Sequence, residues 1–292
     1  MLAMLVLSTA PAARGAEPIC EAGAYGAPDQ DVVVLEVKDW IPSPGLGYLL
    51  LDGRYGSTLS QDGPVSCGPG YVILKTGVAG QVRLEKRSFK RTRKEIPVAG
   101  AVLVGELLEP TGQDVPPVRP LVVMVHGSET EPAIGNNRAY LLAAQGITVF
   151  TYDKRGTGQS GGFYTQNFEL LADDAAAAMA HAQVLAQGRF NRSGYWGQSQ
   201  GGWVAPLAAT RSKVDFVAVG FGLVTSPIDE DREQMLMEAQ TLHLDDHDMA
   251  EIRALSAATA AIVASHFTSG CAGEAAPRNG GRKMASADQR RI

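Results

Sequence analysis

The chain is organised around one stretch, Ser193-Gly194-Tyr195-Trp196-Gly197-Gln198-Ser199-Gln200-Gly201-Gly202-Trp203. Within it, Gly197 to Gly201 matches the pattern G-x-S-x-G, in which a serine sits on a very tight turn between a strand and a helix. Such a turn strains the backbone of the serine and brings the residues two positions before and after it close together. Glycine at both flanking positions leaves room, because it has no Cβ. We therefore expect the Ser199 hydroxyl to stand above a sheet at a helix N-terminus, where backbone N–H groups favour negative charge.

The residues on either side of the pattern favour a strand-turn-helix unit. Residues 193–196 are typical of a short strand, and residues 200–210 carry apolar side chains at helical spacing. An ordinary turn rich in glycine and serine is the alternative, since a five-residue pattern often arises by chance. The flanking strand and helix favour the tight turn.

The composition is that of a globular chain with room for one large α/β domain and a smaller appendage. The chain has 292 residues, a hydrophobic content of 45% and a formal net charge of −5. The negative charge argues against general nucleic-acid binding. One basic cluster is compatible with either a solvated strand or linker or an anion-binding patch. The cluster consists of Lys86, Arg87, Lys90, Arg91, Arg93 and Lys94.

Residues 1–16 have features of a signal peptide, with an apolar run from Leu2 to Leu7 and small residues up to Ala16. They lack the usual basic segment at the start, and they are too short to cross a bilayer as a helix. No other run approaches about 18 apolar residues, the length needed for a span. We therefore expect an exported protein, periplasmic or extracellular, without a membrane span.

The three cysteines leave the redox state open. Cys20 and Cys67 could pair and leave Cys271 alone, and free buried thiols are equally compatible with the sequence. No C-x-x-C pair occurs, so we expect no structural zinc site. We also expect no metal among the site residues.

The pattern of apolar residues and turns changes near residue 95 and divides the chain into two parts. Residues 17–94 hold short apolar stretches separated by glycine and proline turns, which predicts a β-rich N-terminal module. In residues 95–232 strands alternate with helices, which predicts a doubly wound, mostly parallel α/β sheet with helices on both faces. Residues 233–268 are expected to be helical throughout, and residues 269–292 have few large apolar side chains, which predicts disorder. Expected core strands are 102–108, 121–125, 147–152, 193–196 and 216–221, and expected helices are 138–145, 170–187 and 200–210.

Three motifs follow successive strands. They are His126-Gly127-Ser128, then Tyr152-Asp153-Lys154-Arg155-Gly156-Thr157-Gly158-Gln159-Ser160, and then Gly197 to Gly201. On these motifs the chain resembles the α/β-hydrolase superfamily. It is most similar to secreted bacterial hydrolases of the prolyl-oligopeptidase-like or dienelactone-hydrolase-like branch, which carry a β-rich N-terminal extension. The resemblance covers about residues 96–234.

The resemblance implies a serine hydrolase that acts on carboxylic esters or related acyl bonds of small molecules, without a cofactor. Ser199 would form the acyl-enzyme, and the backbone N–H groups of Gln200 and Ser128 would form the oxyanion hole. His126 would be structural, and Asp153 and Arg155 would brace the neighbouring loop. A serine peptidase that cleaves short peptides at the same site is the second interpretation.

The chain departs from the family where the acid and the base of the triad should follow the serine. After residue 221 no further apolar strand ends in an acid or a histidine, so we expect an incomplete sheet, a partial helical cap and an incomplete triad, as in a truncated gene product. A third interpretation follows, that of a non-catalytic binding module or an inactive product. Substitutes within the chain can be named: the acids lie just after the last expected strand, whereas the histidines lie in expected helix, where an ordinary helix histidine is the commoner case. Without a base, Ser199 is a weak nucleophile. Those substitutes are Asp229 or Asp231 as acid and His243, His247 or His266 as base.

Two other patterns match binding motifs without their expected context. Residues 156–161 satisfy G-x-G-x-x-G, but no helix opens at that loop and no acid ends a following strand, as a dinucleotide site requires. His243 and His247 have the spacing of a metal-binding pair on a helix, but Leu244 stands where H-E-x-x-H has glutamate. We expect neither site.

Overall fold

The computed structural model describes residues 20–77, 80–221 and 225–265. The chain divides between residues 222 and 223 into two compact units, and each is described by itself. The predicted signal peptide, the predicted disordered tail and Cys271 lie outside the described residues. No helix in the described ranges is long and apolar enough to cross a bilayer.

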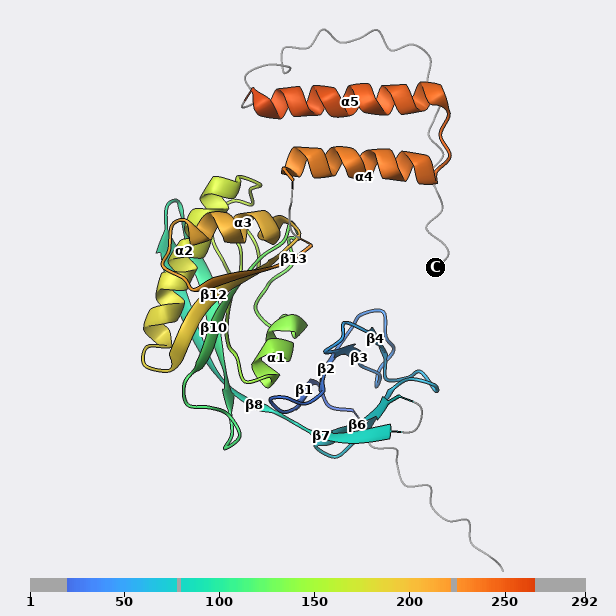
Figure 1. Cartoon of the computed structure of the whole chain (residues 1–292). Coiled ribbons are helices and arrows are strands. Elements are labelled where there is room, and N and C mark those ends of the chain that lie inside the picture. The colour runs from blue at the N-terminus through green and yellow to red at the C-terminus, as the bar shows by residue number, and fades with distance from the viewer. Residues whose placement is uncertain (1–19, 78–79, 222–224, 266–292) are drawn as a thin grey trace, which may run out of the picture. The chain divides into compact units, whose positions relative to one another are not determined.

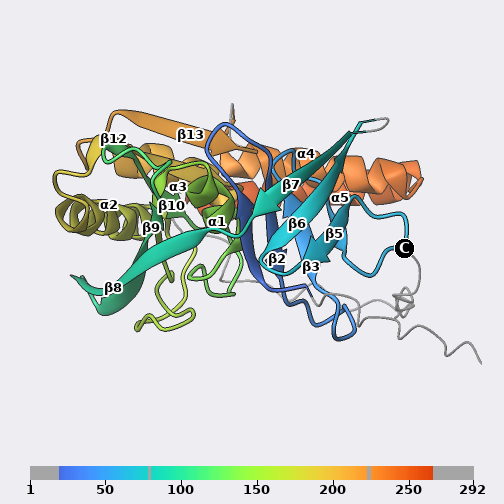
Figure 2. The same cartoon turned by 90° about the horizontal axis from the view of Figure 1, so that it is seen from below.

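The first unit begins with a β-rich module of two antiparallel sheets (Figures 1 and 2). Their facing side chains form a shared core that includes Tyr25, Leu35 and Leu84. Cys20 and Cys67 form a disulfide within this module, with 5.2 Å between their Cα atoms. One sheet comprises β1 (Gly23–Gly26), β2 (Val32–Glu36), β3 (Gly47–Leu50) and β4 (Tyr55–Ser57), and the other comprises β5 (Val65–Gly68), β6 (Tyr71–Thr76) and β7 (Gly80–Glu85).

The second part of this unit is built on a six-stranded sheet in the order β13-β12-β10-β11-β9-β8. The four strands from β13 to β11 run parallel, whereas β9 and β8 are antiparallel to their neighbours. The expected mostly parallel α/β sheet is therefore confirmed. Its strands are β8 (Ser88–Val98), β9 (Ala101–Thr111), β10 (Arg119–Val125), β11 (Thr148–Tyr152), β12 (Phe190–Gln198) and β13 (Phe216–Gly220).

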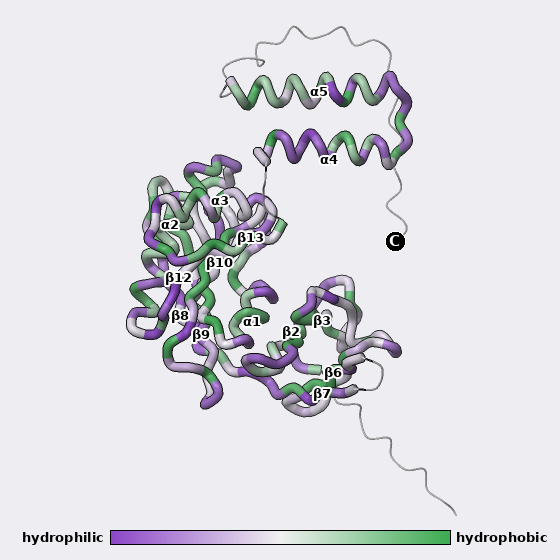
Figure 3. The backbone as a smooth tube through the Cα atoms, viewed as in Figure 1, coloured by the Kyte–Doolittle hydropathy of each residue, from purple (hydrophilic) through white to green (hydrophobic). Residues whose placement is uncertain are grey.

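Helices cover both faces of this sheet, because the central strand β10 is apolar on both sides. Its odd-numbered residues, such as Val123, pack against α2 (Phe168–Leu185) and α3 (Gln200–Ala209). Its even-numbered residues, such as Val122, pack against α1 (Asn137–Ala144). Figure 3 shows the hydrophobic colouring of β10 in this core. Helix α1 also contacts β1 and β2, so the N-terminal module packs on the core through this helix.

The long hairpin of β8 and β9 extends the core sheet further towards the N-terminus than the sequence predicts. The two strands pair from Ser88 with Thr111 to Val98 with Ala101, and Gly100 turns the chain with a φ of 74°. The expected module boundary at residue 94 falls inside β8. The expected strand at residues 102–108 is the central part of the longer strand β9.

The basic cluster lies on and beside β8, and acidic side chains pair with most of it. Arg91 and Arg93 lie 2.9 Å and 3.3 Å from the buried carboxylate of Glu106, and Arg87 lies 2.6 Å from Asp114. These ion pairs neutralise the charge of the cluster locally. The structure therefore favours the solvated strand over the anion-binding patch.

The second unit contains a pair of helices, α4 (Pro227–Thr241) and α5 (Asp246–Ala264). The prediction of one continuous helix over residues 233–268 is wrong, because the backbone turns at His243 with a φ of 52°. The Asp245 side chain then accepts a hydrogen bond from the backbone N–H of Asp248 and starts α5. Helix α4 buries only Ala239, and Figure 3 shows it with both hydrophilic and hydrophobic stretches.

Candidate active site

The predicted tight turn is present between the end of β12 and the start of α3. Ser199 occupies it with φ 52° and ψ −129°, a strained conformation for a residue with a side chain. A Cβ on Gly197 would lie 2.1 Å from the carbonyl oxygen of Gly201, and a Cβ on Gly201 would lie 2.4 Å from that of Val125. Both contacts are shorter than any that real Cβ atoms make. The two glycines are therefore required by close backbone approach, as the sequence predicts.

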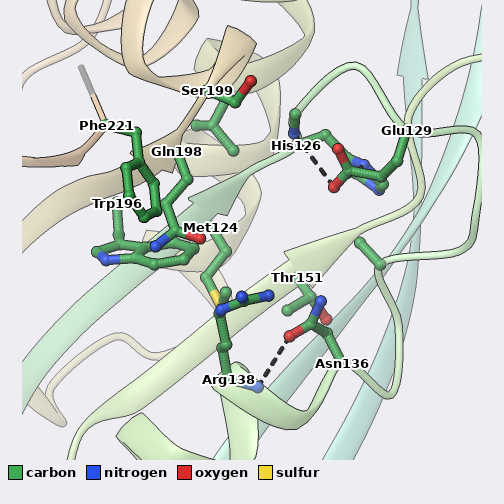
Figure 4. A pocket seen from close by; sticks show the side chains of 13 residues that line it. Met124, His126, Glu129, Asn136, Arg138, Thr151, Trp196, Gln198, Ser199 and Phe221 are labelled. Atoms are coloured by element: carbon green, nitrogen blue, oxygen red, sulfur yellow. Dashed lines mark hydrogen bonds and ion pairs between the residues drawn. The ribbon is translucent and has the colours of Figure 1, made fainter. Parts of the chain in front are cut away.

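This geometry leaves Ser199 exposed, while Gly197 and Gln200 are buried. Ser199 lines a pocket of about 290 Å³ at the carboxyl end of the parallel strands (Figure 4). The pocket has an apolar wall and several polar groups, a common composition for small-molecule sites. The apolar side chains are Met124, Trp196 and Phe221, and the polar ones include Asn136, Arg138 and Gln198.

The first predicted motif lies on the same pocket. His126 and Gly127, which follow β10, line it together with Ser199. Ser128 is exposed, and neither it nor Gln200 is among the lining residues. Ser128 directly follows Gly127, and Gln200 directly follows Ser199; both Gly127 and Ser199 line the pocket. The structure therefore brings the two loops of the predicted oxyanion hole to one site.

The Glu129 side chain folds back onto the two residues that begin this loop, His126 and Gly127. Its carboxylate accepts a hydrogen bond from the Gly127 N–H at 3.3 Å and lies 3.5 Å from Nδ1 of His126 (Figure 4). The neighbouring imidazole and the backbone N–H groups lower the pKa of Glu129 to about 2. Glu129 is therefore ionised at neutral pH. His126 is buried beside it, and its structural role stays a prediction.

The second predicted motif braces the site from the end of β11. The Asp153 carboxylate accepts hydrogen bonds from the backbone N–H groups of Ala133, Ile134 and Gln159, at 2.8–3.1 Å. Arg155 forms two hydrogen bonds, 2.6 Å and 2.7 Å long, to the buried Asp174 on α2. These contacts are consistent with the bracing that the resemblance implies.

The glycines of the G-x-G-x-x-G pattern have structural roles in this loop. A Cβ on Gly156 would lie 2.1 Å from the backbone nitrogen of Tyr164, and one on Gly158 would lie 2.2 Å from Asp153 Oδ2. The loop therefore folds tightly on itself, and α2 begins only at Phe168. This arrangement does not present a helix N-terminus to a pyrophosphate.

Lys154 contributes a contact that the sequence did not predict. Its side chain is buried, and Nζ donates a hydrogen bond of 2.8 Å to the carbonyl oxygen of Gly127. Burial lowers the pKa of Lys154, while the negative charge of Glu129 acts in the opposite direction. The signal that was available is a lysine placed directly after a buried strand and next to the bracing Asp153 and Arg155.

Two of the substitutes for the triad acid and base have local partners in the second unit. Asp229 exchanges hydrogen bonds with the helix-capping Ser226, and His247 lies 3.5 Å from Glu251 on the same helix. His266 lies outside the described residues. Within the described part of the chain, no hydrogen bond joins the Ser199 hydroxyl to an imidazole or a carboxylate, and no cluster of three metal-ligating side chains occurs.

A protein-family model matches the part of the chain that carries this site. The family model for hydrolases described as serine aminopeptidase, S33, matches residues 116–245, which is less than half of the chain. That range includes all three motifs and the pocket residues named above. A comparison with curated protein sequences found no match.

Several solved structures are similar to part of the chain. The α/β hydrolase GrgF from Penicillium sp. sh18 is 24% identical with a TM-score of 0.40, over 52% of this chain and 53% of that one. An esterase from Pyrococcus furiosus is 22% identical with a TM-score of 0.42, over 57% and 62%. The rice cell wall degrading esterase LipA from Xanthomonas oryzae is 23% identical with a TM-score of 0.35, over 49% and 38%. The chain thus spans between 38% and 62% of the length of these three structures.

The family match spans the glycine-flanked turn at Ser199. The branch within the superfamily stays a prediction. The family match, the turn at Ser199 and the order of strands and helices together support an α/β-hydrolase fold of the serine-hydrolase type.

Proposed function

We propose that Ser199 is the nucleophile of a serine hydrolase that acts on carboxylic esters of small molecules. The observation that carries this proposal is the strained, exposed conformation of Ser199 between two glycines whose Cβ atoms would collide with backbone. Strain of this kind costs roughly 1–3 kcal/mol and persists where the surrounding structure enforces it, most often at functional sites. A turn of this kind would present the Ser199 hydroxyl to the pocket, with the N–H of the next residue, Gln200, beside it.

The reaction would begin with attack of Ser199 Oγ on the ester carbonyl carbon, while the hydroxyl proton passes to solvent water at the exposed serine. The carbonyl oxygen takes the negative charge, and the N–H groups of Gln200 and Ser128 would stabilise it. Collapse expels the alcohol and leaves the acyl-enzyme, which water hydrolyses. Esters with good leaving groups need the least help from a base. We therefore expect measurable acylation from activated esters first.

The expectation of an incomplete triad bears on the rate. Enzymes that lose a triad member keep a residual acceleration of about 10³–10⁴ over water from the oxyanion hole and binding. The same residual rate is expected here if no imidazole reaches Ser199. Hydrolysis of p-nitrophenyl acetate by the full chain and by Ser199→Ala tests the proposal. Activity that is lost in Ser199→Ala supports it, and equal activity in both proteins contradicts it.

A second candidate is hydrolysis of short peptides, in line with the description of the matching family. Glu129 favours it, since its ionised carboxylate lines the pocket and could pair with the ammonium group of a peptide N-terminus. Aminoacyl anilides compared with p-nitrophenyl esters separate the two candidates. A preference for anilides that falls in Glu129→Gln would favour the peptidase.

A further inference from the structure

We propose that Lys154 and Tyr164 are positioning residues that clamp the two successive peptide groups of the loop at residues 127–129, so that the Ser128 N–H faces the pocket. This inference rests on the proposed function, because it concerns one of the two oxyanion donors. Within the loop, the Glu129 carboxylate accepts a hydrogen bond from the Gly127 N–H, but no contact inside the loop holds the carbonyl oxygens of Gly127 and Ser128. The loop follows a strand, and Ser128 and Glu129 are exposed.

The first peptide group is held by Lys154. Its Nζ donates to the carbonyl oxygen of Gly127 at 2.8 Å. A trans peptide is planar, and its C=O and N–H point in opposite directions. A fixed Gly127 carbonyl therefore fixes the N–H of Ser128, which belongs to the same peptide group, in the direction away from Lys154. Gly127 and Ser199 both line the pocket.

The second peptide group is held by Tyr164. Its hydroxyl donates to the carbonyl oxygen of Ser128 at 2.6 Å. The Lys154 ammonium lies 4.6 Å from the centroid of the Tyr164 ring, within the range of a cation–π contact. The two clamping side chains thus support each other as well as the loop.

A chain of hydrogen bonds connects this clamp to the nucleophile turn. Gln166 Nε2 donates to the Tyr164 hydroxyl, and Gln200 Nε2 donates to Gln166 Oε1. Gln200 carries the other proposed oxyanion donor on its backbone. The loops that hold the two donors are therefore linked through Tyr164 and Gln166, and a change at one end is expected to reach the other.

The choice of residue at position 154 argues for a positioning role over a packing role. A buried ammonium is costly unless it is paired, and the partners of Lys154 are the neutral Gly127 carbonyl, the face of the Tyr164 ring and the nearby charge of Glu129. An apolar side chain of similar length, such as methionine, would fill the same volume without that cost. What methionine cannot do is hold the Gly127 carbonyl.

The test uses the full chain with Lys154→Met and Tyr164→Phe, which keep side-chain volume and remove one donor each. Lys94→Met, an exposed lysine on β8, and Tyr55→Phe, a tyrosine that is 78% exposed, are the matched controls. The first readout is hydrogen exchange of the segment at residues 125–132, followed by mass spectrometry, which needs no activity. The second is kcat and KM for p-nitrophenyl acetate, with the thermal midpoint measured alongside.

We expect faster exchange of the loop in both clamp variants, with exchange in α2 unchanged. Removal of one oxyanion donor costs about 10²–10³ in kcat, so a misdirected donor is expected to lower kcat by about 10-fold to 100-fold with KM little changed. Lys154→Arg, which restores a cationic donor, is expected to recover part of the loss. Unchanged loop exchange in both variants would overturn the clamp, even if kcat fell.

These outcomes separate the clamp from the proposed function. If wild-type activity does not depend on Ser199 but loop exchange rises in both variants, the clamp stands and the function is wrong. If Ser199 is needed and both clamp variants keep wild-type kcat, the function stands and the positioning role is wrong.

Discussion

Replacement of Gly201 by alanine tests the structural basis of the nucleophile turn. The added Cβ would lie 2.4 Å from the carbonyl oxygen of Val125 and 2.9 Å from that of His126. Both atoms belong to the backbone of β10 and the loop after it, so neither can rotate away as a flexible side chain would. The turn or the strand must shift by several tenths of an ångström.

Overpacking of this kind costs typically about 1–3 kcal/mol, and contact with backbone places Gly201→Ala at the upper end. A loss of about 3 kcal/mol with a urea m-value of about 2–3 kcal/mol/M lowers the unfolding midpoint by about 1 M. The assay is urea unfolding followed by tryptophan fluorescence and circular dichroism, together with hydrolysis of p-nitrophenyl acetate. We expect the midpoint and the activity to fall together, because the clash displaces Ser199 as well.

Gly161→Ala is the matched control. A Cβ there would meet its nearest atom, the Val102 carbonyl oxygen, at 3.6 Å, an ordinary van der Waals contact. We expect this control to change the free energy of unfolding by less than about 1 kcal/mol. If Gly201→Ala lowered the midpoint no more than Gly161→Ala, the argument from close backbone approach would be refuted.

Three further predictions concern side chains around the site. Arg155→Met leaves the buried carboxylate of Asp174 without its partner, so it is expected to lower the free energy of unfolding by about 3–5 kcal/mol, measured with urea. A loss below about 1 kcal/mol would mean that this ion pair does not hold the loop. The pKa of Glu129 is about 2 in the folded protein, against an ordinary value of 4.5. The ionised side chain therefore stabilises the fold fully at pH values above 4.5, and this stabilisation is lost as the pH falls towards 2. Because the Glu129 side chain is 50% exposed, that contribution is discounted to about 1 kcal/mol, and thermal midpoints between pH 6 and pH 2 should fall less steeply in Glu129→Gln than in the wild type. Arg138 lines the pocket and has no ion pair among the described residues. Arg138→Gln is therefore expected to lower kcat/KM about 10-fold for esters with an acidic acyl chain and to leave kcat/KM for neutral esters unchanged. Equal effects on both kinds of ester would contradict a charge contact between Arg138 and the substrate.

The sequence predicts the core of the fold well because local pattern and tertiary role coincide there. The apolar run of β10 is buried on both faces, and the glycines around Ser199 meet backbone, as their spacing indicates. The end of β8 is less predictable. Its charged residues resemble a linker, and only pairing with β9 shows that they belong to the core sheet.

The interruption between α4 and α5 shows why periodicity alone is insufficient. Apolar residues continue at helical spacing across it, but His243 adopts a positive φ that few residues with side chains favour. The capping residue Asp245 was the available signal for a new helix N-terminus. Helix ends depend on such single residues more than on the average pattern.

The clamp around the loop at residues 127–129 could not be predicted, because it joins residues from three separate segments. Lys154 follows β11, Tyr164 and Gln166 precede α2, and Gln200 begins α3. No motif contains all of them. Their roles depend on distances that only the folded chain shows.

The central claim is that the hydroxyl of Ser199 is a nucleophile that faces an oxyanion hole. Incubation of the full chain with a fluorophosphonate tests it most directly, since a bond forms between Ser199 Oγ and phosphorus as fluoride leaves. We predict one adduct, mapped by peptide mass spectrometry to Ser199 and absent from Ser199→Ala. Labelling that is absent, or that maps elsewhere and persists in Ser199→Ala, would contradict the claim.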